Sequence, residues 1–129
     1  EAPKKEEPVP QAVRAEDIER QIQTIHFDFD KYEIRSGDAE ILKENGRILN
    51  ENTSLKVKIE GHCDERGSVE YNLALGERRA KAARDYLVTL GIEKQRLSTI
   101  SYGEERPADP GHDESAWEKN RRDEFRVQP

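Results

Sequence analysis

Segments in which apolar and polar residues alternate are separated along this chain by longer segments with a helical period. The clearest alternation is LKVKIEG (55–61), whose Leu, Val and Ile would face a core while its Lys and Glu face solvent. One polar face predicts a sheet that helices cover on one side only. The other expected strands are IQTIHFDF (22–29), with Ile25, Phe27 and Phe29 pointing inward, LSTISYG (97–103) and EFRVQ (124–128).

Three helices are expected between these strands. The first begins near residues 36–38 and ends at ENTS (51–54), and the second runs from about Val69 to Leu90, where Gly91 is placed to end it. The third is ESAWEKN (114–120). The order β-α-β-α-β-α-β predicts an α/β two-layer sandwich, with the helices on one face of a mixed four-stranded sheet.

The first part of the chain differs in composition from the rest. Residues 1–20 are strongly charged, and three prolines stand in EAPKKEEPVP. This composition predicts an extended tether over residues 1–20, followed by one folded domain over residues 21–129. A cloning remnant is the alternative interpretation of the first residues.

The charge balance and the single cysteine exclude several classes of protein. Twenty-two basic and 28 acidic residues give a net charge of −6, which argues against a nucleic-acid partner because such binding needs a basic surface. No apolar run approaches the roughly 20 residues that span a bilayer. Cys63 is the only cysteine, so the chain has no internal disulfide.

The segment HCDERG (62–67) was considered as a metal or catalytic site. His62, Cys63 and Asp64 can each bind a metal ion, but the spacings C-x-x-C and H-E-x-x-H are absent, and adjacent residues at a strand end point in opposite directions. No G-x-S-x-G elbow is present, and no pair of carboxylates stands out among the 28 acids. We therefore expect no metal, no cofactor and no enzymatic activity, with Cys63 as a small buried residue.

The loop and helix in GHCDERGSVEYNLALGERRA (61–80) form a better candidate for a binding site. A loop that leaves a strand and enters a helix often opens a ligand pocket in an α/β layer. Asp64 lies in that loop, and Arg79 lies about three turns into the helix, beside its apolar face. An outward-facing Arg79 could grip a carboxylate with two hydrogen bonds while Asp64 receives an ammonium, so the pair suits a free amino acid end. An internal Asp64–Arg79 salt bridge without a ligand is equally compatible with the spacing.

The same residues resemble a known family. GHCDERGSVEYNLALGERRAKAARDYL (61–87), FDFDKYE (27–33) and SYGEERPADPGHDESAWEKNRR (101–122) are similar to the peptidoglycan-associated lipoprotein branch of the OmpA C-terminal-like family, over roughly Gln21 to Val127. The general family pattern is met at Asp64, Gly67, Asn72, Leu75 and Arg79-Ala80.

The resemblance implies non-covalent binding of peptidoglycan at the meso-diaminopimelate of its stem peptide, which has a free amino acid end. Asp64 and Arg79 would then hold its amine and carboxylate, and Asp30 with Phe29 would line the same pocket. The remaining residues carried over from the family are Asn72, Leu75 and Gly76, which would shape the pocket wall, and Asn120 and Arg122, which would close it from the C-terminal side.

The resemblance also implies a place in the cell envelope. It suggests a protein that tethers the outer membrane to the cell wall from the periplasmic side, with the periplasmic propeller protein of the Tol system as a partner. Because Glu1 is not the lipidated cysteine of such lipoproteins, the lipid anchor would lie upstream of this chain.

One departure from the family pattern leaves alternatives open. Cys63 stands where the family has threonine, and a thiol is a much weaker hydrogen-bond donor than a hydroxyl. A protein-interaction domain with weakened wall binding is therefore an alternative, and a wall-cleaving enzyme is a less favoured one.

Overall fold

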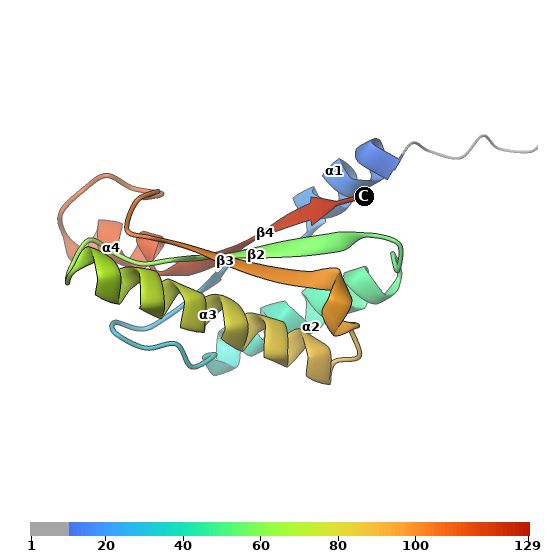
Figure 1. Cartoon of the computed structure of the whole chain (residues 1–129), viewed down its shortest axis with the longest axis horizontal. Helices are drawn as coiled ribbons and strands as arrows, with labels where there is room; N and C mark the ends of the chain where they lie inside the picture. Colours follow the sequence, from blue (N-terminus) through green and yellow to red (C-terminus); the bar gives the residue numbers. More distant parts are fainter. Residues whose placement is uncertain (1–10) are drawn as a thin grey trace, which may run out of the picture.

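A mixed four-stranded sheet forms the centre of the protein (Figure 1). The structure is a computed structural model and describes residues 11–129. The sheet has the order β1-β4-β2-β3, with β2 and β3 parallel and β4 antiparallel to both β1 and β2. The strands are β1 (Ile25–His26), β2 (Lys56–His62), β3 (Leu97–Gly103) and β4 (Arg122–Gln128).

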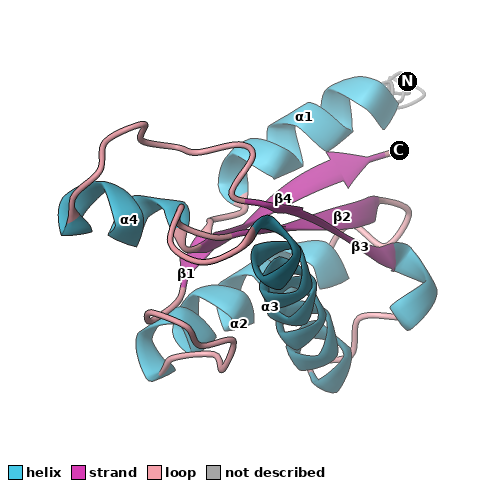
Figure 2. Cartoon of the chain, turned by 60° about the vertical axis from the view of Figure 1, so that its left-hand side comes forward, coloured by secondary structure: helices cyan, strands magenta, loops and turns pink. Residues whose placement is uncertain are grey.

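Two long helices cover one face of this sheet (Figure 2), so the predicted α/β sandwich is confirmed. The helices are α1 (Gln11–Gln21), α2 (Ser36–Asn50), α3 (Val69–Thr89) and α4 (Glu114–Asn120), with a short 3₁₀ turn, η1 (Lys94–Arg96), before β3. It is α2 and α3 that cover the face (Figure 2). The apolar residues of β2 and β4 that point toward them, among them Val57, Ile59 and Phe125, are buried in one core.

Helix α1 corrects the prediction of an extended tether over residues 1–20. Residues 11–20 are helical, while residues 1–10 lie outside the described part of the chain. Ala15 and Ile18 are one turn apart and join the main core, and the carboxylate of Glu19 accepts a hydrogen bond from the backbone N–H of Val127, 2.8 Å away. Helix α1 thus packs against β4 (Figure 1). The high charge of the segment hid its narrow apolar stripe.

Strand β1 is shorter than the predicted strand at 22–29. Ile25 and Phe27 are fully buried as expected, but only residues 25 and 26 pair with β4. Beyond Phe27 the chain leaves the sheet, and Phe29 is 54% exposed instead of facing the core. The alternating period correctly indicated a strand, but it did not show where the chain turns away.

Two glycines bring the first half of α3 into close contact with the sheet. A Cβ atom built on Gly61 of β2 would lie 1.8 Å from the carbonyl oxygen of Gly76, and one on Gly76 would lie 2.2 Å from the hydroxyl of Ser101. Only residues without a side chain allow the helix to approach β2 and β3 at this point. The contact fixes the height of α3 above the end of β2.

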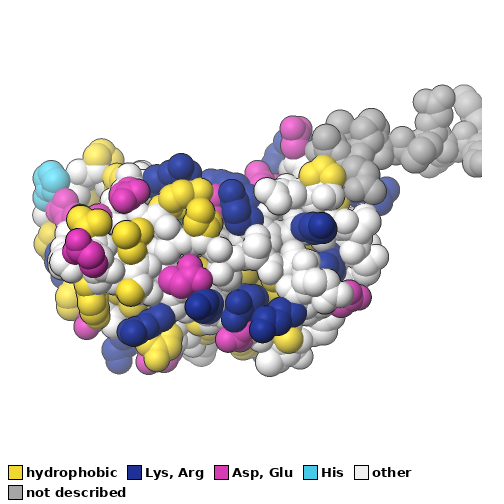
Figure 3. All heavy atoms as spheres, in the orientation of Figure 1, with side chains coloured by type: hydrophobic (Ala, Val, Ile, Leu, Met, Phe, Trp, Pro, Cys, Tyr) yellow, Lys and Arg dark blue, Asp and Glu magenta, His cyan; other side chains and the backbone are white. Residues whose placement is uncertain are grey.

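The other face of the sheet is less exposed than the alternation predicted. Lys56 is exposed, but Glu60 and His62 are buried at the far end of β2. Tyr102 covers His62 with a ring centroid distance of 5.5 Å, and the guanidinium of Arg106 stacks on Tyr102. Burial lowers the pKa of His62 to about 4, with a further contribution from the positive charge of Arg122. Elsewhere basic and acidic side chains are interspersed on the face shown in Figure 3.

Candidate functional site

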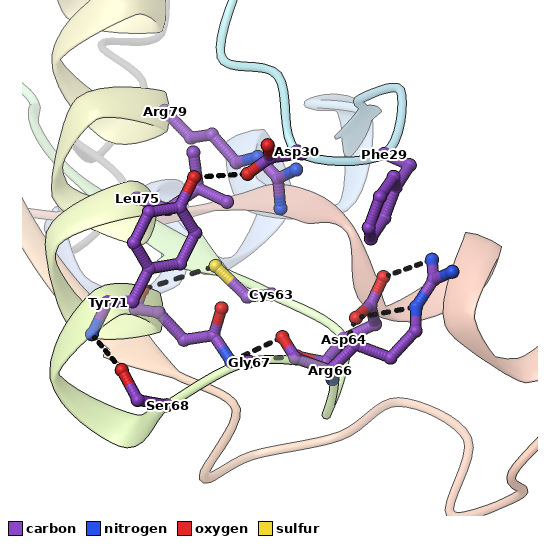
Figure 4. A pocket seen from close by; sticks show the side chains of 11 residues that line it. Phe29, Asp30, Cys63, Asp64, Arg66, Gly67, Ser68, Tyr71, Leu75 and Arg79 are labelled. Atoms are coloured by element: carbon purple, nitrogen blue, oxygen red, sulfur yellow. Dashed lines mark hydrogen bonds and ion pairs between the residues drawn. The ribbon is translucent and has the colours of Figure 1, made fainter.

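A cavity of about 400 Å³ opens between the start of α3, the loop after β2 and the loop after β1 (Figure 4). It combines charged, aromatic and apolar side chains from three segments that are far apart in the sequence. Its lining residues are Phe29, Asp30, Cys63, Asp64, Arg66, Gly67, Ser68, Tyr71, Asn72, Leu75 and Arg79. The structure thus brings together six of the nine residues that the resemblance implied: Phe29, Asp30, Asp64, Asn72, Leu75 and Arg79.

Arg79 forms the floor of the cavity and is only 1% exposed. Its Nε donates to the carbonyl of Lys31 at 2.8 Å, its Nη1 to the carbonyl of His62 at 3.0 Å, and its Nη2 to the carbonyl of Asp28 at 3.1 Å. The guanidinium is therefore not the free, outward-facing fork expected from the sequence. It ties both loops to α3 and still has one unused N–H on each terminal nitrogen, because a guanidinium carries five N–H groups.

Asp64 lies across the cavity from Arg79 and is paired with other arginines. Arg66 donates to the Asp64 carboxylate from Nη2 at 2.9 Å and from Nε at 3.3 Å, and Arg121 lies 3.6 Å away. Burial would raise the pKa of the Asp64 carboxyl, but the hydrogen bonds and charge of Arg66 outweigh it, so the pKa is lowered. Asp64 is thus ionised at neutral pH, and the alternative of a direct Asp64–Arg79 salt bridge is not what the structure contains.

Arg66 is held between two aromatic rings at the edge of the cavity. Its guanidinium carbon lies 3.9 Å from the ring centroid of Phe29 and 4.2 Å from that of Trp117 in α4. Such stacking stabilises a cation at each ring face. The stack connects the loops after β1 and β2 to α4 and keeps Arg66 over Asp64.

The mouth of the cavity is formed by exposed aromatic side chains and a carboxylate (Figure 4). Phe29 is 54% and Tyr71 is 47% exposed, and they stand on opposite sides of the opening. The Tyr71 hydroxyl donates to the carboxylate of Asp30. Asp30 has a backbone φ of 57°, a left-handed conformation that aspartate adopts more readily than most residues.

The wall between floor and mouth is held by buried polar contacts. Asn72 is buried, and its side-chain nitrogen contacts the carbonyls of Asp64 and Arg66 and the carboxylate of Glu104, at 3.0–3.3 Å. The thiol of Cys63 donates to the carbonyl of Asn72 at 3.2 Å. Burial raises the pKa of the Cys63 thiol to about 11, so the thiol is protonated and acts as a donor that orders the loop.

Gly76 supports the site without lining it. Its close contact with Gly61 sets the approach of α3 to the sheet, and Leu75, the preceding residue, then reaches the cavity wall. The first turn of α3 is fixed by Ser68, whose hydroxyl accepts from the backbone N–H of Tyr71 at 3.1 Å. These contacts hold the helical part of the site in place.

Asn120 and Arg122 do not close the cavity, contrary to the expectation from the resemblance. The side-chain oxygen of Asn120 accepts from the backbone N–H groups of Ala108 and Asp109 at 2.7 and 2.9 Å, so it holds the loop before α4. Arg122 bonds to Glu124 and to the carbonyl of Arg106, away from the cavity. The intervening residue, Arg121, approaches Asp64 instead, since successive residues of a strand point to opposite faces.

The sequence analysis missed three cavity residues that carry side-chain chemistry: Arg66, Ser68 and Tyr71. Ser68 was detectable as a helix cap, because it directly precedes the first apolar residue of α3. Tyr71 is an aromatic residue on the polar side of a helix start, which is a signal for a surface that binds something. Nothing in the sequence distinguished Arg66 from the many other charged residues.

The arrangement suits a small ligand that carries both charges and an apolar chain. The floor offers two N–H groups of Arg79, the walls offer the carboxylates of Asp64 and Asp30, and the mouth offers two aromatic rings. Within residues 11–129, no three His, Cys, Asp or Glu side chains are grouped to hold a metal ion. None of the helices in the same residues is long and apolar enough to cross a membrane.

Comparisons with known proteins identify the family of the chain. The model of the OmpA family matches residues 26–121. The peptidoglycan-associated lipoproteins of Pasteurella multocida and Haemophilus influenzae are each 48% identical, over 83% and 82% of this chain and 71% and 69% of their own length.

Solved structures show the same fold. The crystal structure of the peptidoglycan-associated lipoprotein from Burkholderia pseudomallei is 36% identical, with a TM-score of 0.81 over 85% of this chain and 93% of that one. The C-terminal domain of Helicobacter pylori MotB, at 20% identity and a TM-score of 0.78 over 84% of this chain and 85% of that one, shares the fold. Together, the matched residues and the identity to these relatives show that the chain belongs to the OmpA family.

Proposed function

We propose that this chain binds peptidoglycan non-covalently, through the free amino acid end of the diaminopimelate in a stem peptide, and so helps to tether the outer membrane to the cell wall. The observation that carries the proposal is the cavity, in which a buried arginine and two carboxylates from separate segments face one space. The names of relatives at 48% identity support the choice of peptidoglycan as ligand.

The ligand's carboxylate would meet the two unused N–H groups of Arg79. Arg79 lines the cavity and its three other N–H groups are already hydrogen-bonded, so the guanidinium would need no rearrangement to bind a carboxylate. A preorganised donor of this kind loses little side-chain entropy on binding. The three carbonyl contacts of Arg79 thus support binding as well as the fold.

The ligand's ammonium would be received by the carboxylates of Asp64 and Asp30. Asp64 is already paired with Arg66, which is 30% exposed, so an incoming ammonium would share Asp64 with Arg66 or move it aside. Asp30 lies at the mouth, and within residues 11–129 its carboxylate is hydrogen-bonded only to the Tyr71 hydroxyl. Phe29, Tyr71 and Leu75 would cover the aliphatic chain between the two ends of the ligand.

In the cell we propose the same envelope role that the resemblance implies. A lipid anchor upstream of this chain would hold the domain at the periplasmic side of the outer membrane, and the propeller protein of the Tol system would be its protein partner. Single contacts need not be strong, because many anchored copies on one polymer gain by multivalency.

The test is a titration of the tripeptide L-Ala-γ-D-Glu-meso-diaminopimelate by calorimetry, together with sedimentation on purified sacculi. Arg79→Lys and Asp64→Asn should each weaken binding at least tenfold, because a charge-assisted contact contributes about 1.5–3 kcal/mol. Arg96→Lys is the matched control. Arg96 is also buried and also donates to three backbone carbonyls, but it does not line the cavity.

The outcome distinguishes the alternatives. If Arg79→Lys and Arg96→Lys weaken binding equally, the loss reflects stability rather than ligand contact, and the assignment of this cavity is wrong. If the wild-type chain gives no heat with the tripeptide and stays in the supernatant with sacculi, the alternative of a protein-interaction domain is favoured.

A further inference from the structure

Asp123 is buried beneath the cavity and has no role in the site as described so far. Its side chain is fully buried, and neither carboxylate oxygen has a hydrogen-bond partner among the described residues. On β4 it pairs with Gly61 of β2 and with Ile25 of β1. Asp123 lies two and four positions before Phe125 and Val127, which belong to the core. Residues at this spacing share one face of a strand, so Asp123 lies on the face of the sheet that α3 covers.

Arg79 is the positive charge that acts on this carboxylate: its Nη1 donates to the carbonyl of His62, next to Gly61, which pairs with Asp123. Their charges interact, and the hydrogen bonds of Arg79 go only to neutral carbonyls, so no carboxylate neutralises the guanidinium by direct contact. Burying a charge without a partner costs free energy, because the charge loses its hydration. Two opposite charges that are buried near each other offset part of this cost by their attraction. Cys63 and Asp64 in the loop and Arg121 at the end of α4 are the other groups that act on Arg79.

A ligand carboxylate on Arg79 would change this balance. One guanidinium would then face two carboxylates in a region closed to solvent, and like charges at such a site favour protonation of one of them. The ligand carboxylate keeps direct hydrogen bonds, whereas Asp123 has none to lose. Asp123 is therefore the group that becomes neutral.

We propose that Asp123 is a proton-linked positioning residue for the cavity: it balances Arg79 when the site is empty and takes up one proton from solvent, on a carboxylate oxygen, when an anionic ligand binds. The inference rests on the proposed function, because it requires a ligand carboxylate at Arg79. Binding would consequently be tighter at lower pH over the range in which the empty protein still holds Asp123 ionised.

The direction of the pKa of Asp123 is consistent with proton uptake by this group. Burial raises the pKa of Asp123 well above its ordinary value, against the opposing effect of the Arg79 charge. A bound carboxylate would raise it further. Uptake is therefore expected between the pKa of the empty and the occupied protein, above the range of Asp64, whose pKa is lowered.

The experiment is calorimetric titration of the same tripeptide at pH 5 to 8, at each pH in two buffers that both buffer there and whose different ionisation heats reveal the number of protons exchanged. The wild-type protein should take up a proton in part of this range, with affinity falling by up to about tenfold per pH unit there. Asp123→Asn should show no uptake and a flat profile. Glu124→Gln is the matched control, since it removes the adjacent carboxylate, whose partners are Arg122 and Arg126, and it should behave like wild type.

A second measurement does not depend on the variant's folding. The carboxyl carbon of Asp123 in the wild-type protein, followed by NMR over the same pH range, should titrate at higher pH with the tripeptide bound than without it. Uptake that persists in Asp123→Asn, or an Asp123 signal that ligand does not change, overturns the inference while the proposed function stands. An absence of any binding by the wild-type protein overturns both.

Discussion

Two buried arginines occupy opposite ends of β2, and each donates to three backbone carbonyls. Arg79 holds the carbonyls of Asp28, Lys31 and His62, where β2 ends. Arg96 holds those of Leu49, Asn52 and Leu55, where β2 begins. In both places burial lowers the pKa of the guanidinium. In both places an arginine supplies hydrogen-bond donors to backbone carbonyls that are withdrawn from water.

Their surroundings separate a structural arginine from a candidate binding arginine. Arg96 satisfies carbonyls near the C-terminal end of α2, where a helix leaves acceptors unpaired and a positive charge is favourable. Arg79 joins two loops, lies beside a cavity and faces an unpartnered carboxylate. Burial and hydrogen bonding alone therefore do not identify a site, whereas the cavity and the surplus charge around it do.

Replacing each arginine by alanine gives the largest expected difference between the two regions. Arg79→Ala should destabilise the protein by roughly 3–5 kcal/mol, because it removes the donor to the buried carbonyl of His62 and to the part-buried carbonyls of Lys31 and Asp28, and leaves Asp123 without its compensating charge. Arg96→Ala should cost less, about 2–3 kcal/mol, because water can reach a helix end more easily. Urea denaturation of both variants measures the difference. A larger loss for Arg96→Ala would show that Asp123 and Arg79 do not depend on each other.

The glycine contact offers a second test at the Arg79 end alone. Gly61→Ala should destabilise by on the order of 2–3 kcal/mol and also weaken tripeptide binding, because its Cβ would collide with the carbonyl of Gly76 and lift α3 from the sheet. Gly37→Ala in α2 is the control, with no atom within 4 Å of the new Cβ, and should be neutral or slightly stabilising. Tripeptide affinity that is unchanged in Gly61→Ala would mean that the height of α3 does not set the cavity.

A third test uses pH at His62, whose carbonyl accepts from Arg79. Burial lowers the pKa of His62 from its ordinary value of 6.5 to about 4, so protons bind preferentially to the unfolded chain between these values. The contribution of neutral His62 to the free energy of unfolding is fully present above pH 6.5. It decreases as the pH falls toward 4, by at most about 3 kcal/mol. The slope of unfolding free energy against pH should be shallower in His62→Gln than in wild type. Equal slopes would mean that His62 is solvated in the folded protein.

The sequence was sufficient for most of the fold and for part of the site. Strand 97–103 and the helix from Val69 were both predicted, the helix because its apolar residues recur with a helical period and Gly91 is placed to end it. Helix α1 was not, since its apolar stripe is narrow and its composition resembles a linker. Asp64 and Arg79 were found as a pair because strand-to-helix loops are frequent binding sites.

The rest of the site depends on contacts that no local pattern encodes. The carbonyls that bind Arg79 belong to Asp28, Lys31 and His62, and carbonyls look identical in any sequence. The approach of Arg121 rather than Arg122 to Asp64 depends on how the chain leaves α4 and enters β4, which no local pattern shows. The burial of Asp123 likewise depends on its pairing with both β1 and β2.

The C-terminus and the start of α1 lie at the opposite end of the sheet from the cavity. Lys56, where β2 begins, pairs with Gln128 near the last residue, and α1 starts at the same end of the sheet, whereas the cavity lies where β2 finishes (Figure 1). A tag, surface linker or fluorescent fusion joined at the C-terminus would therefore leave the binding face unobstructed. The domain can be immobilised on a sensor chip in a single orientation with its cavity facing the analyte.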